Sequence, residues 1–317
     1  MSAWAALSVP SHAGELHIVT GDNPGVEFVN FVAAVGNARK RGADIRVSYF
    51  NSENIAAEAV VSGIADLAIG TPYNFIHKSA EPVRMIAQLS RLRFHPMVNS
   101  ARYKTWQDLE GAKVFVHGAG SGTEAIMGFM AQKHQITYSG IHYLPGSNVR
   151  ATAMLQGRIE ASILDTKWMK LLLRRGAGRF AALPMDNLNI TDEALFGNLA
   201  TIKAKQASVE ILLEEILRAW RMVNANPVSI TAGDRARDAL TTLSKDEREG
   251  VVAYYKNAVE AREFPDNGGM ANDFLEDLRF YAAAGSIGGE PQQLAVEKFW
   301  YLPPLRNARA ALGKAQK

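Results

Sequence analysis

A short loop between a predicted strand and a predicted helix holds three glycines, a serine and a threonine. The strand is the apolar run 113–116, and a helical pattern begins at about residue 122. Such loops cradle phosphate groups, carry a nucleophile, or expose the bare N–H groups of a helix start to an anion. The loop residues that could do this chemistry are Gly118, Gly120, Ser121, Gly122 and Thr123.

The first two alternatives fail on spacing. A P-loop needs Lys directly after its last glycine, whereas Thr123 and Glu124 follow Gly122. The dinucleotide fingerprint needs G-x-G-x-x-G, and the glycines here run G-x-G-x-G. The nucleophile elbow needs G-x-S-x-G, but Ala119 and Thr123 stand at its outer positions. We therefore expect neither nucleotide binding nor serine catalysis at this loop.

The third alternative asks only for small residues at a helix start. Ser121 can cap the helix, with Glu124 reaching back to complete a capping box. The first N–H groups of a helix lack internal partners, and the helix dipole adds positive potential there. We expect Gly120, Ser121, Gly122 and Thr123 to hold a carboxylate, sulfonate or phosphate. The structural alternative is a plain strand-to-helix turn.

Loops after the other predicted strands supply further candidates, because open α/β sheets bind ligands beyond the carboxyl ends of their strands. Asn and Ser offer hydrogen bonds, Tyr and Trp offer flat apolar faces, and Asp can read charge. Phe94 and His95 lie near a predicted crossing between the two halves of the chain. The same residue types are also common in turns and caps for local backbone reasons. The loop candidates are Asn23, Asn51, Ser52, Tyr73, Asn74, Ser147, Asn148, Asp165 and Trp168.

Metal and cofactor chemistry finds little support in the sequence. The chain has no Cys, which excludes disulfides, thiolate metal sites and Cys nucleophiles. Its seven histidines are scattered and form no H-E-x-x-H or similar spacing. We expect no metal, no cofactor and no catalytic residue.

These candidate loops are positioned by strands and helices that alternate along the chain. Strand-like runs at 15–20, 44–50 and 65–70 are separated by helical patterns, an order that predicts a parallel sheet with helices on its faces. The order then recurs. Residues 16–28 align with 113–125, and residues 60–71 align with 154–165, with Gly63 matching Gly157. Two similar α/β lobes are the better interpretation, with chance similarity as the alternative.

The last third of the chain reads mostly as helices, which we expect to return to the first lobe. A separate third domain is the alternative, but no Pro/Gly/Ser-rich linker sets this segment apart. We expect lobe 1 to comprise residues 15–94 and 198–317, and lobe 2 to comprise residues 95–197. Residues 1–14 are either a frayed tail or the remnant of a shortened export signal, and the small-x-small run Ser11-His12-Ala13 favours the remnant.

The composition of the chain limits the kinds of partner that it is expected to bind. The chain has 317 residues, 47% of them hydrophobic, which is ample for more than one core. The net charge is only +3, and no block of five or more Lys/Arg occurs, so we expect no nucleic-acid partner. No run of 18 apolar residues is present, so we predict no membrane-spanning segment.

The whole order resembles the type II periplasmic binding proteins, and within them the substrate-binding components of ABC importers in the nitrate/sulfonate/taurine and thiamine-precursor group. The resemblance rests on 63–76, 103–130 and 155–168 and extends over about residues 15–300. It implies an α/β fold of two lobes joined by a hinge, each a mostly parallel sheet flanked by helices. The group's glycine/serine helix start falls on Gly120 to Thr123, and its ligand-contacting turn falls on Thr71, Pro72, Tyr73 and Asn74.

The resemblance implies a non-catalytic, exported solute-binding protein of the periplasm. It would act as a monomer, capture a small anionic or carboxylated organic ligand between its lobes and deliver it to the membrane permease of an ABC importer. Three alternatives stay open. One is an enzyme on the same two-lobed scaffold, such as a decarboxylase, dehydratase or transferase. Another is a TAXI-type binding protein of a TRAP transporter, which the loop 118–124 resembles. The third is a cytoplasmic sensor lobe.

Overall fold

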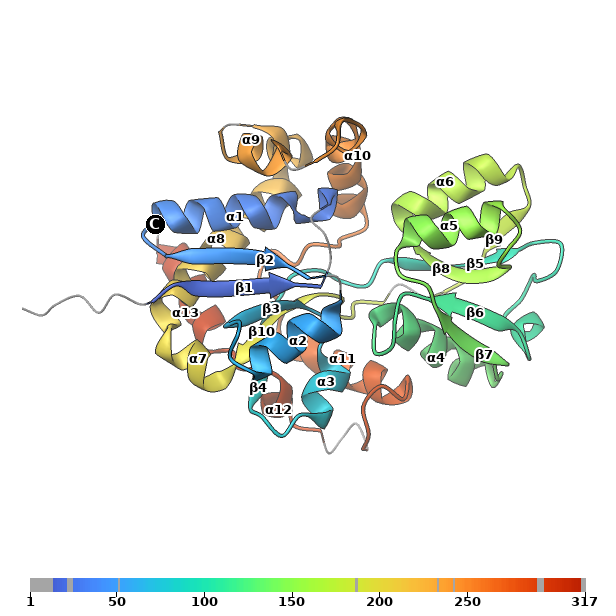
Figure 1. The fold of residues 1–317 in the computed structure, drawn as a ribbon, viewed down its shortest axis with the longest axis horizontal. Coiled ribbons are helices and arrows are strands. Elements are labelled where there is room, and N and C mark those ends of the chain that lie inside the picture. Colours follow the sequence, from blue (N-terminus) through green and yellow to red (C-terminus); the bar gives the residue numbers. More distant parts are fainter. Residues whose placement is uncertain are drawn as a thin grey trace, which may run out of the picture.

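The computed structural model describes residues 14–21, 25–50, 52–185, 188–232, 234–241, 243–289 and 294–314. These residues form two five-stranded sheets, each with helices on its faces (Figure 1). The expected two-lobed α/β architecture is therefore present. The segment interpreted as a signal remnant lies outside the described residues, apart from Gly14.

The first sheet has the strand order β2-β1-β3-β10-β4. Strand β1 pairs in parallel with β2 and β3, whereas β10 is antiparallel to both β3 and β4. All five residues of β1 are buried, and its apolar side chains enter the cores on both faces of the sheet. The strands are β1 (Leu16–Thr20), β2 (Ile45–Tyr49), β3 (Leu67–Gly70), β4 (Val83–Gln88) and β10 (Ala194–Asn198).

The second sheet repeats this plan with the order β7-β6-β8-β5-β9. Strand β6 is parallel to β7 and β8, and β5 is antiparallel to β8 and β9. Strands β6, β7 and β8 thus occupy the places of β1, β2 and β3, as the sequence repeat predicted. The strands are β5 (Phe94–Asn99), β6 (Lys113–Val116), β7 (Gly140–Tyr143), β8 (Ala161–Asp165) and β9 (Phe180–Ala182).

The chain crosses between the sheets after β4 and again before β10. The two crossing segments hydrogen-bond to each other, from Leu92 N to Ile190 O at 2.9 Å and from Asp192 N to Ser90 O at 3.0 Å. The expected boundary between residues 197 and 198 falls inside β10, a strand that pairs in the first sheet. We propose that the second crossing, at about residue 190, is the better boundary between the lobes.

Helices from both ends of the chain pack around the first sheet. Helix α8 packs between α1 and α13 over one face of the sheet. The helices before the second sheet are η1 (Val26–Phe28), α1 (Val29–Lys40), α2 (Glu53–Val61) and α3 (Tyr73–Lys78). Those after it are α7 (Leu199–Ala204), α8 (Gln206–Ala225), η3 (Pro227–Thr231), α9 (Asp234–Thr241), α10 (Lys245–Glu260), α11 (Ala271–Ala283), α12 (Val296–Phe299) and α13 (Pro303–Lys314).

Lobe 2 places α5 and α6 on one face of its sheet and α4 on the other (Figure 1). Before β6 the chain forms a single 3-10 turn, and the Asp108 carboxylate accepts the Thr105 N–H at 2.8 Å. The helices are η2 (Gln107–Leu109), α4 (Gly122–His134), α5 (Ser147–Leu155) and α6 (Thr166–Gly176).

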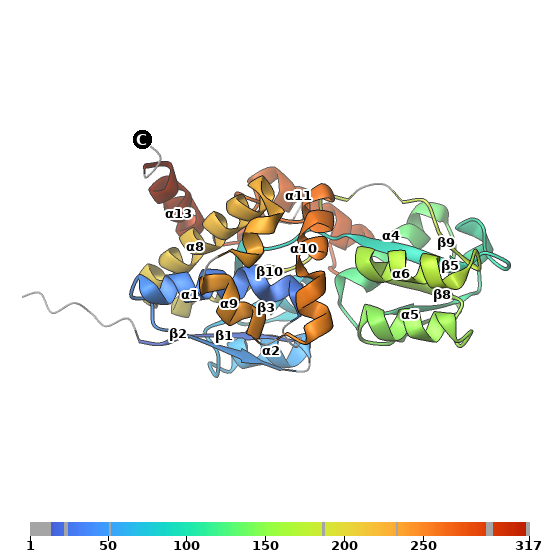
Figure 2. The same cartoon turned by 90° about the horizontal axis from the view of Figure 1, so that it is seen from above.

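The two lobes share one hydrophobic core on the α4 side, where α11 of lobe 1 meets α4 of lobe 2 (Figure 2). The rings of Phe129 and Phe280 lie 5.1 Å apart, centroid to centroid. Gly128 permits this approach, because a Cβ there would lie 2.9 Å from the Ala284 carbonyl oxygen. Burying aromatic side chains contributes roughly 1.5–3 kcal/mol each, so this side joins the lobes firmly.

Candidate functional site

A cavity of about 570 Å³ lies between the lobes, on the side of α6 and α10. Lobe 2 lines it with the loops that follow β6, β7 and β8. Lobe 1 lines it with η1, both crossing segments, α10 and the turn after α10. Its position agrees with the rule that ligands bind beyond the carboxyl ends of parallel strands, and its size suits a small organic molecule.

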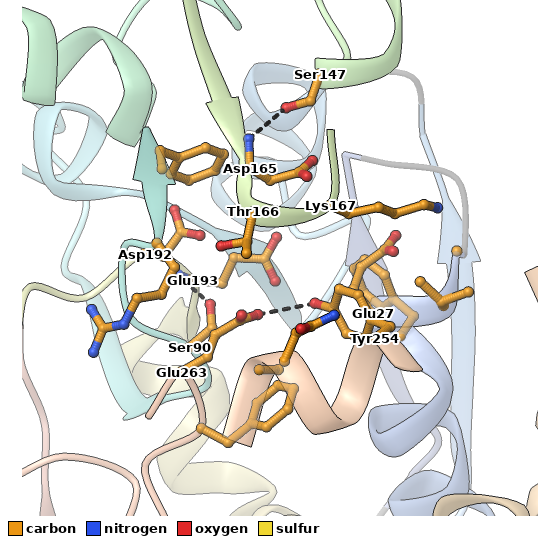
Figure 3. A pocket seen from close by; sticks show the side chains of 18 of the residues that line it. Glu27, Ser90, Ser147, Asp165, Thr166, Lys167, Asp192, Glu193, Tyr254 and Glu263 are labelled. Atoms are coloured by element: carbon orange, nitrogen blue, oxygen red, sulfur yellow. Dashed lines mark hydrogen bonds between the residues drawn. The ribbon is translucent and has the colours of Figure 1, made fainter. Parts of the chain in front are cut away.

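The lobe 2 wall of the cavity is built from the starts of two helices (Figure 3). Asp165 is the N-cap of α6, and its Oδ1 accepts the N–H of Trp168 at 2.8 Å. The Asp165 N–H in turn donates to Ser147 Oγ at 3.3 Å, at the start of α5. Four predicted site residues, Ser147, Asn148, Asp165 and Trp168, thus line a single cavity.

The lobe 1 wall has an aromatic floor. Phe28, Phe31, Trp220 and Phe264 are all nearly fully buried and line the cavity. The rings of Trp220 and Phe264 meet edge to face at 5.8 Å, and Trp220 Nε1 donates to the Leu89 carbonyl at 2.7 Å. This fixed apolar surface suits the body of an organic solute.

Carboxylates outnumber cationic side chains around the cavity. Of the three cationic residues, Arg93 directs its donors to main-chain carbonyls, with Nε 2.6 Å from Ala261 O and Nη1 2.5 Å from Leu188 O. The cationic residues of the lining are Arg91, Arg93 and Lys167. The acidic residues are Glu27, Asp165, Asp192, Glu193, Glu247 and Glu263. The wall is therefore acidic rather than basic.

The environment of the cavity strongly perturbs the carboxylate of Glu263. Removal from water raises its pKa to about 7, and the nearby charges of Asp165 and Glu27 act in the same direction. A hydrogen bond from Tyr254 Oη, 2.9 Å from Oε1, and the charge of Arg93 partly oppose the rise in pKa. Asp165 belongs to the opposite lobe, so carboxylates of both lobes influence one another across the cavity (Figure 3).

The mouth of the cavity is bridged by polar contacts between α6 and α10. Lys170 Nζ donates to Asn257 Oδ1 at 2.6 Å, which links the two lobes directly. The ammonium of Lys167 lies 5.5 Å from the centre of the Trp168 ring. The pKa of Glu247 is lowered mainly by its bonds with Ser244 and slightly by the charge of Lys167.

The glycine loop at the start of α4 lies outside this cavity. Ser121 caps the helix as predicted, although Glu124 reaches the N–H of Gly120 at 2.6 Å rather than that of Ser121. A Cβ on Gly122 would lie 2.5 Å from Leu92 Cδ2 and 3.1 Å from Asp192 Oδ1. The helix start is thus packed against the crossing segments. Ser121 and Thr123 are buried, and the hydroxyls bond to each other at 2.9 Å.

A second cavity, of about 310 Å³, brings together three other predicted residues, Thr71, Asn74 and Gly120. Gly120 adopts a φ of 78°, and a Cβ added there would lie 3.1 Å from Asn74 Nδ2. The Oδ1 atom of Asn74 is buried without a hydrogen-bond partner among the described residues. Thr71 Oγ1 donates to the Asp192 carbonyl at 2.7 Å, which joins this turn to the second crossing.

Tyr73 takes a different place from the one expected. It is fully buried inside lobe 1, where its hydroxyl donates to Asp277 Oδ2 at 2.5 Å and its ring stacks on Tyr281 at 4.3 Å. Its flat face is therefore covered by protein and offers no surface to a ligand. Burial raises the pKa of Asp277 to about 7, against the effect of its bonds with Thr191 and Tyr73.

The remaining candidates are dispersed. Ser52 precedes α2 without a side-chain capping bond and is not among the residues lining either cavity. Phe94 lines the larger cavity, and His95 Nε2 bonds Thr166 Oγ1 at 3.0 Å beside it. Asn23 and Asn51 lie outside the described residues.

Sequence reasoning missed the lobe 1 contribution to the larger cavity, above all Tyr254, Asn257 and Glu263. The helix 245–260 that carries two of them was expected. Only its packing against η1 brings them to the cavity mouth. A local signal was available in the turn after that helix, where the acidic Glu263 stands between Arg262 and Phe264.

Within the described residues, no group of three or more His, Asp or Glu side chains converges closely enough to hold a metal ion. A search of the same residues for a helix with the length and apolarity needed to cross a bilayer found none.

Comparison with known proteins gives a family and a fold. The sequence matches the model of a family described as NMT1/THI5 like over residues 39–230, which is more than half of the chain. No curated protein matches it.

Solved structures of low sequence identity share the fold over nearly the whole chain. A protein from Bordetella bronchiseptica RB50 is 20% identical, covering 95% of this chain and 99% of its own, with a TM-score of 0.73. The periplasmic nitrate-binding protein NrtA from Synechocystis PCC 6803 is 13% identical, covering 94% and 88%, with a TM-score of 0.67. The sulfonate-binding protein SsuA from Methylobacillus flagellatus KT is the periplasmic component of a putative sulfonate ABC transporter. It is 14% identical, covering 94% of each chain, with a TM-score of 0.61. This likeness establishes the two-lobed periplasmic-binding-protein fold.

Proposed function

The chain belongs to the NMT1/THI5-like family, and from that premise we propose that it is the solute-binding component of an ABC-type importer. It captures one small organic molecule between its lobes and passes it to a membrane permease. Periplasmic binding proteins for nitrate and sulfonate share its fold, which supports this role. We further propose that it works in the periplasm, as a monomer and without turnover of the solute.

The inter-lobe cavity is the observation that carries the proposal. Its walls come from both lobes, so a bound molecule contacts both and stabilises the arrangement in which they meet. The two crossing segments are hydrogen-bonded to each other and can act as the hinge. The Lys170–Asn257 bond closes over the cavity mouth and would hold the lobes together around the solute.

The test is mass spectrometry of small molecules that co-purify with the protein and are released by denaturation. We expect one compound in near-stoichiometric amount with the wild-type protein, recovered chemically unchanged. Trp168→Ala removes an aromatic wall of the cavity and should lose that compound while keeping its fold by circular dichroism. Retention of the compound by Trp168→Ala would place the solute elsewhere, and its conversion into a product would contradict a purely binding role.

A further inference from the structure

We propose that the solute is a small organic cation, an amine or quaternary ammonium compound with an apolar or aromatic body. This inference rests on the proposed function and specifies the ligand class of the same cavity. It replaces the expectation of an anionic or carboxylated ligand, which depended on the start of α4. That helix start is packed against Leu92 and lies close to Asp192.

Carboxylates reach the cavity from both lobes. Asp165 projects from lobe 2, while Glu263 and Glu27 belong to lobe 1 (Figure 3). Neither Asp165 nor Glu263 forms an ion pair with any residue in the described part of the chain. Among the described residues, the only hydrogen bonds that their carboxylates accept come from the Trp168 N–H and the Tyr254 hydroxyl. When both are ionised, two like charges therefore face each other across the cavity, which opposes approach of the lobes.

The cationic side chains of the lining offset this charge only in part: the charge of Arg93 acts to lower the pKa of Glu263, but its hydrogen-bond donors are used elsewhere. The guanidinium of Arg93 is bound to the carbonyls of Ala261, Leu188, Leu92 and Arg262. Arg91 likewise donates to the Arg262 carbonyl, at 3.2 Å. Lys167 is exposed at the mouth, where its ammonium lies over the Trp168 ring. An anion in the cavity would meet the carboxylates, and the nearby guanidinium groups are already engaged.

The aromatic walls complete the recognition of a cation. Trp168 and Phe94 of lobe 2 and Tyr254 of lobe 1 line the same space as the carboxylates. Aromatic faces attract organic cations, and more strongly where water is excluded. The buried floor of Trp220 and Phe264 accommodates an apolar body. Aromatic rings together with opposed carboxylates suit an alkyl or aryl ammonium compound better than a neutral or anionic solute.

A bare metal ion does not fit these carboxylates. No group of three or more potential ligands converges among the described residues, so the acidic side chains stand too far apart for one ion. The cavity of about 570 Å³ is also far larger than a metal site requires. The positive charge must therefore arrive on a molecule large enough to span the space between the lobes.

Binding of a cation explains how capture of the solute is coupled to closure of the two lobes. Asp165 and Glu263 lie on opposite lobes, so a positive charge between them turns a repulsive contact into two attractive ones. The groups that surround Glu263 are Tyr254, Arg93, Asp165 and Glu27, and burial among them raises its pKa to about 7. A bound cation favours the ionised carboxylate, so binding near neutral pH releases a proton from Glu263.

The first experiment separates the charge of the solute from the existence of a site. A metabolite extract is divided by ion exchange into cationic, neutral and anionic fractions, and the melting temperature of the ligand-free protein is measured with each. We expect a rise with the cationic fraction alone. Stabilisation by only the neutral or anionic fraction would overturn the cation assignment and leave the proposed function standing. No stabilisation by any fraction would overturn both.

The second experiment assigns the charge to these residues, using an active amine purified from the cationic fraction. Asp165→Asn and Glu263→Gln should each weaken its affinity at least about tenfold by calorimetry. Glu249→Gln, which removes an exposed carboxylate of α10 outside the lining, should leave affinity within about twofold. Calorimetry in buffers of different ionisation enthalpy should detect proton release in the wild type and none in Glu263→Gln. Unchanged affinity in both cavity variants, or equal proton release by Glu263→Gln and the wild type, would overturn the assignment.

Discussion

Helices α4 and α6 begin in similar ways and lie in the same lobe, yet their surroundings differ. Each has a polar N-cap whose side chain accepts a main-chain N–H, Ser121 for α4 and Asp165 for α6. The start of α4 is packed against Leu92 of the crossing, whereas the start of α6 borders the large cavity. The start of a helix thus borders a space large enough for a ligand only where the opposite lobe does not pack against it.

The contrast extends to the two sides of the molecule. On the α4 side, α11 and α4 share a hydrophobic core that includes Phe129 and Phe280. On the α6 side, the lobes meet at a polar contact, the Lys170–Asn257 hydrogen bond, over a cavity lined by carboxylates. We infer that the α4 side is the fixed connection and that the α6 side opens and closes.

The largest effect that we expect is a loss of stability on substituting Asp277, on the α4 side where the lobes are firmly connected. This fully buried carboxylate accepts hydrogen bonds from the Thr191 N–H at 2.8 Å and from the Tyr73 hydroxyl, and so ties α11 to the crossing. Asp277→Ala leaves these donors unsatisfied and should lower the free energy of unfolding by about 3 kcal/mol in urea titration. Glu276→Ala, on the exposed face of α11, should change it by less than about 0.5 kcal/mol. If the two substitutions lowered the free energy of unfolding equally, Asp277 would not be a residue that joins the two lobes.

The next effect concerns the pH dependence of stability on the opening side. The pKa of Glu263 is raised from 4.5 to about 7 in the folded protein, so its contribution to stability is full below pH 4.5 and is lost as the pH rises through 7. Glu263→Gln cannot ionise. Relative to the wild type, it should gain up to about 3 kcal/mol of unfolding free energy between pH 4 and pH 8. Parallel pH profiles for the two proteins would contradict a raised pKa at Glu263.

A smaller effect is expected from a matched pair of helix glycines. Ala normally stabilises a helix by about 1 kcal/mol over Gly, and Gly36→Ala on α1 should do so because nothing lies within 4 Å of the added Cβ. Gly128→Ala on α4 would place its Cβ 2.9 Å from the Ala284 carbonyl oxygen. It should instead cost about 1–2 kcal/mol. Stabilisation by both substitutions would show that the α4–α11 interface is loosely packed.

The smallest effect is expected at the bridge over the cavity mouth. Lys170→Ala removes a single, largely exposed hydrogen bond between the lobes, so solute affinity should fall only about two- to fivefold. Lys256→Ala removes a comparable charge from the exposed surface of α10 and serves as the control. Calorimetry with the co-purified solute measures both. A loss of a hundredfold or more in Lys170→Ala would make the bridge a main determinant of closure.

Much of the fold could be predicted because local patterns in the sequence specify it. The apolar run that becomes β1, the turn at Gly63 and its counterpart at Gly157 are repeated features, and they correctly predicted two equivalent sheets. The antiparallel place of β10 in the first sheet could not be predicted, because it depends on how the chain returns after the second lobe.

Site residues could be predicted only where their position follows from the neighbouring sequence. Ser147, Asn148, Asp165 and Trp168 follow strands directly, so the rule on strand ends found them. Tyr73 follows β3 in the same way, but α11 and Trp300 cover it, and no nearby residue signals that. Glu263 lies about 100 positions from Asp165 in sequence, and only the packing of the two lobes brings their charges together.

The most direct test of the central claim compares solute occupancy by native mass spectrometry in two double variants. Ser121→Ala/Thr123→Val alters the start of α4, and Asp165→Asn/Trp168→Ala alters the start of α6. Because the solute is held on the α6 side, we expect near-wild-type occupancy in the first variant and loss of the solute in the second. The opposite result, with loss at α4 and retention at α6, would contradict the account.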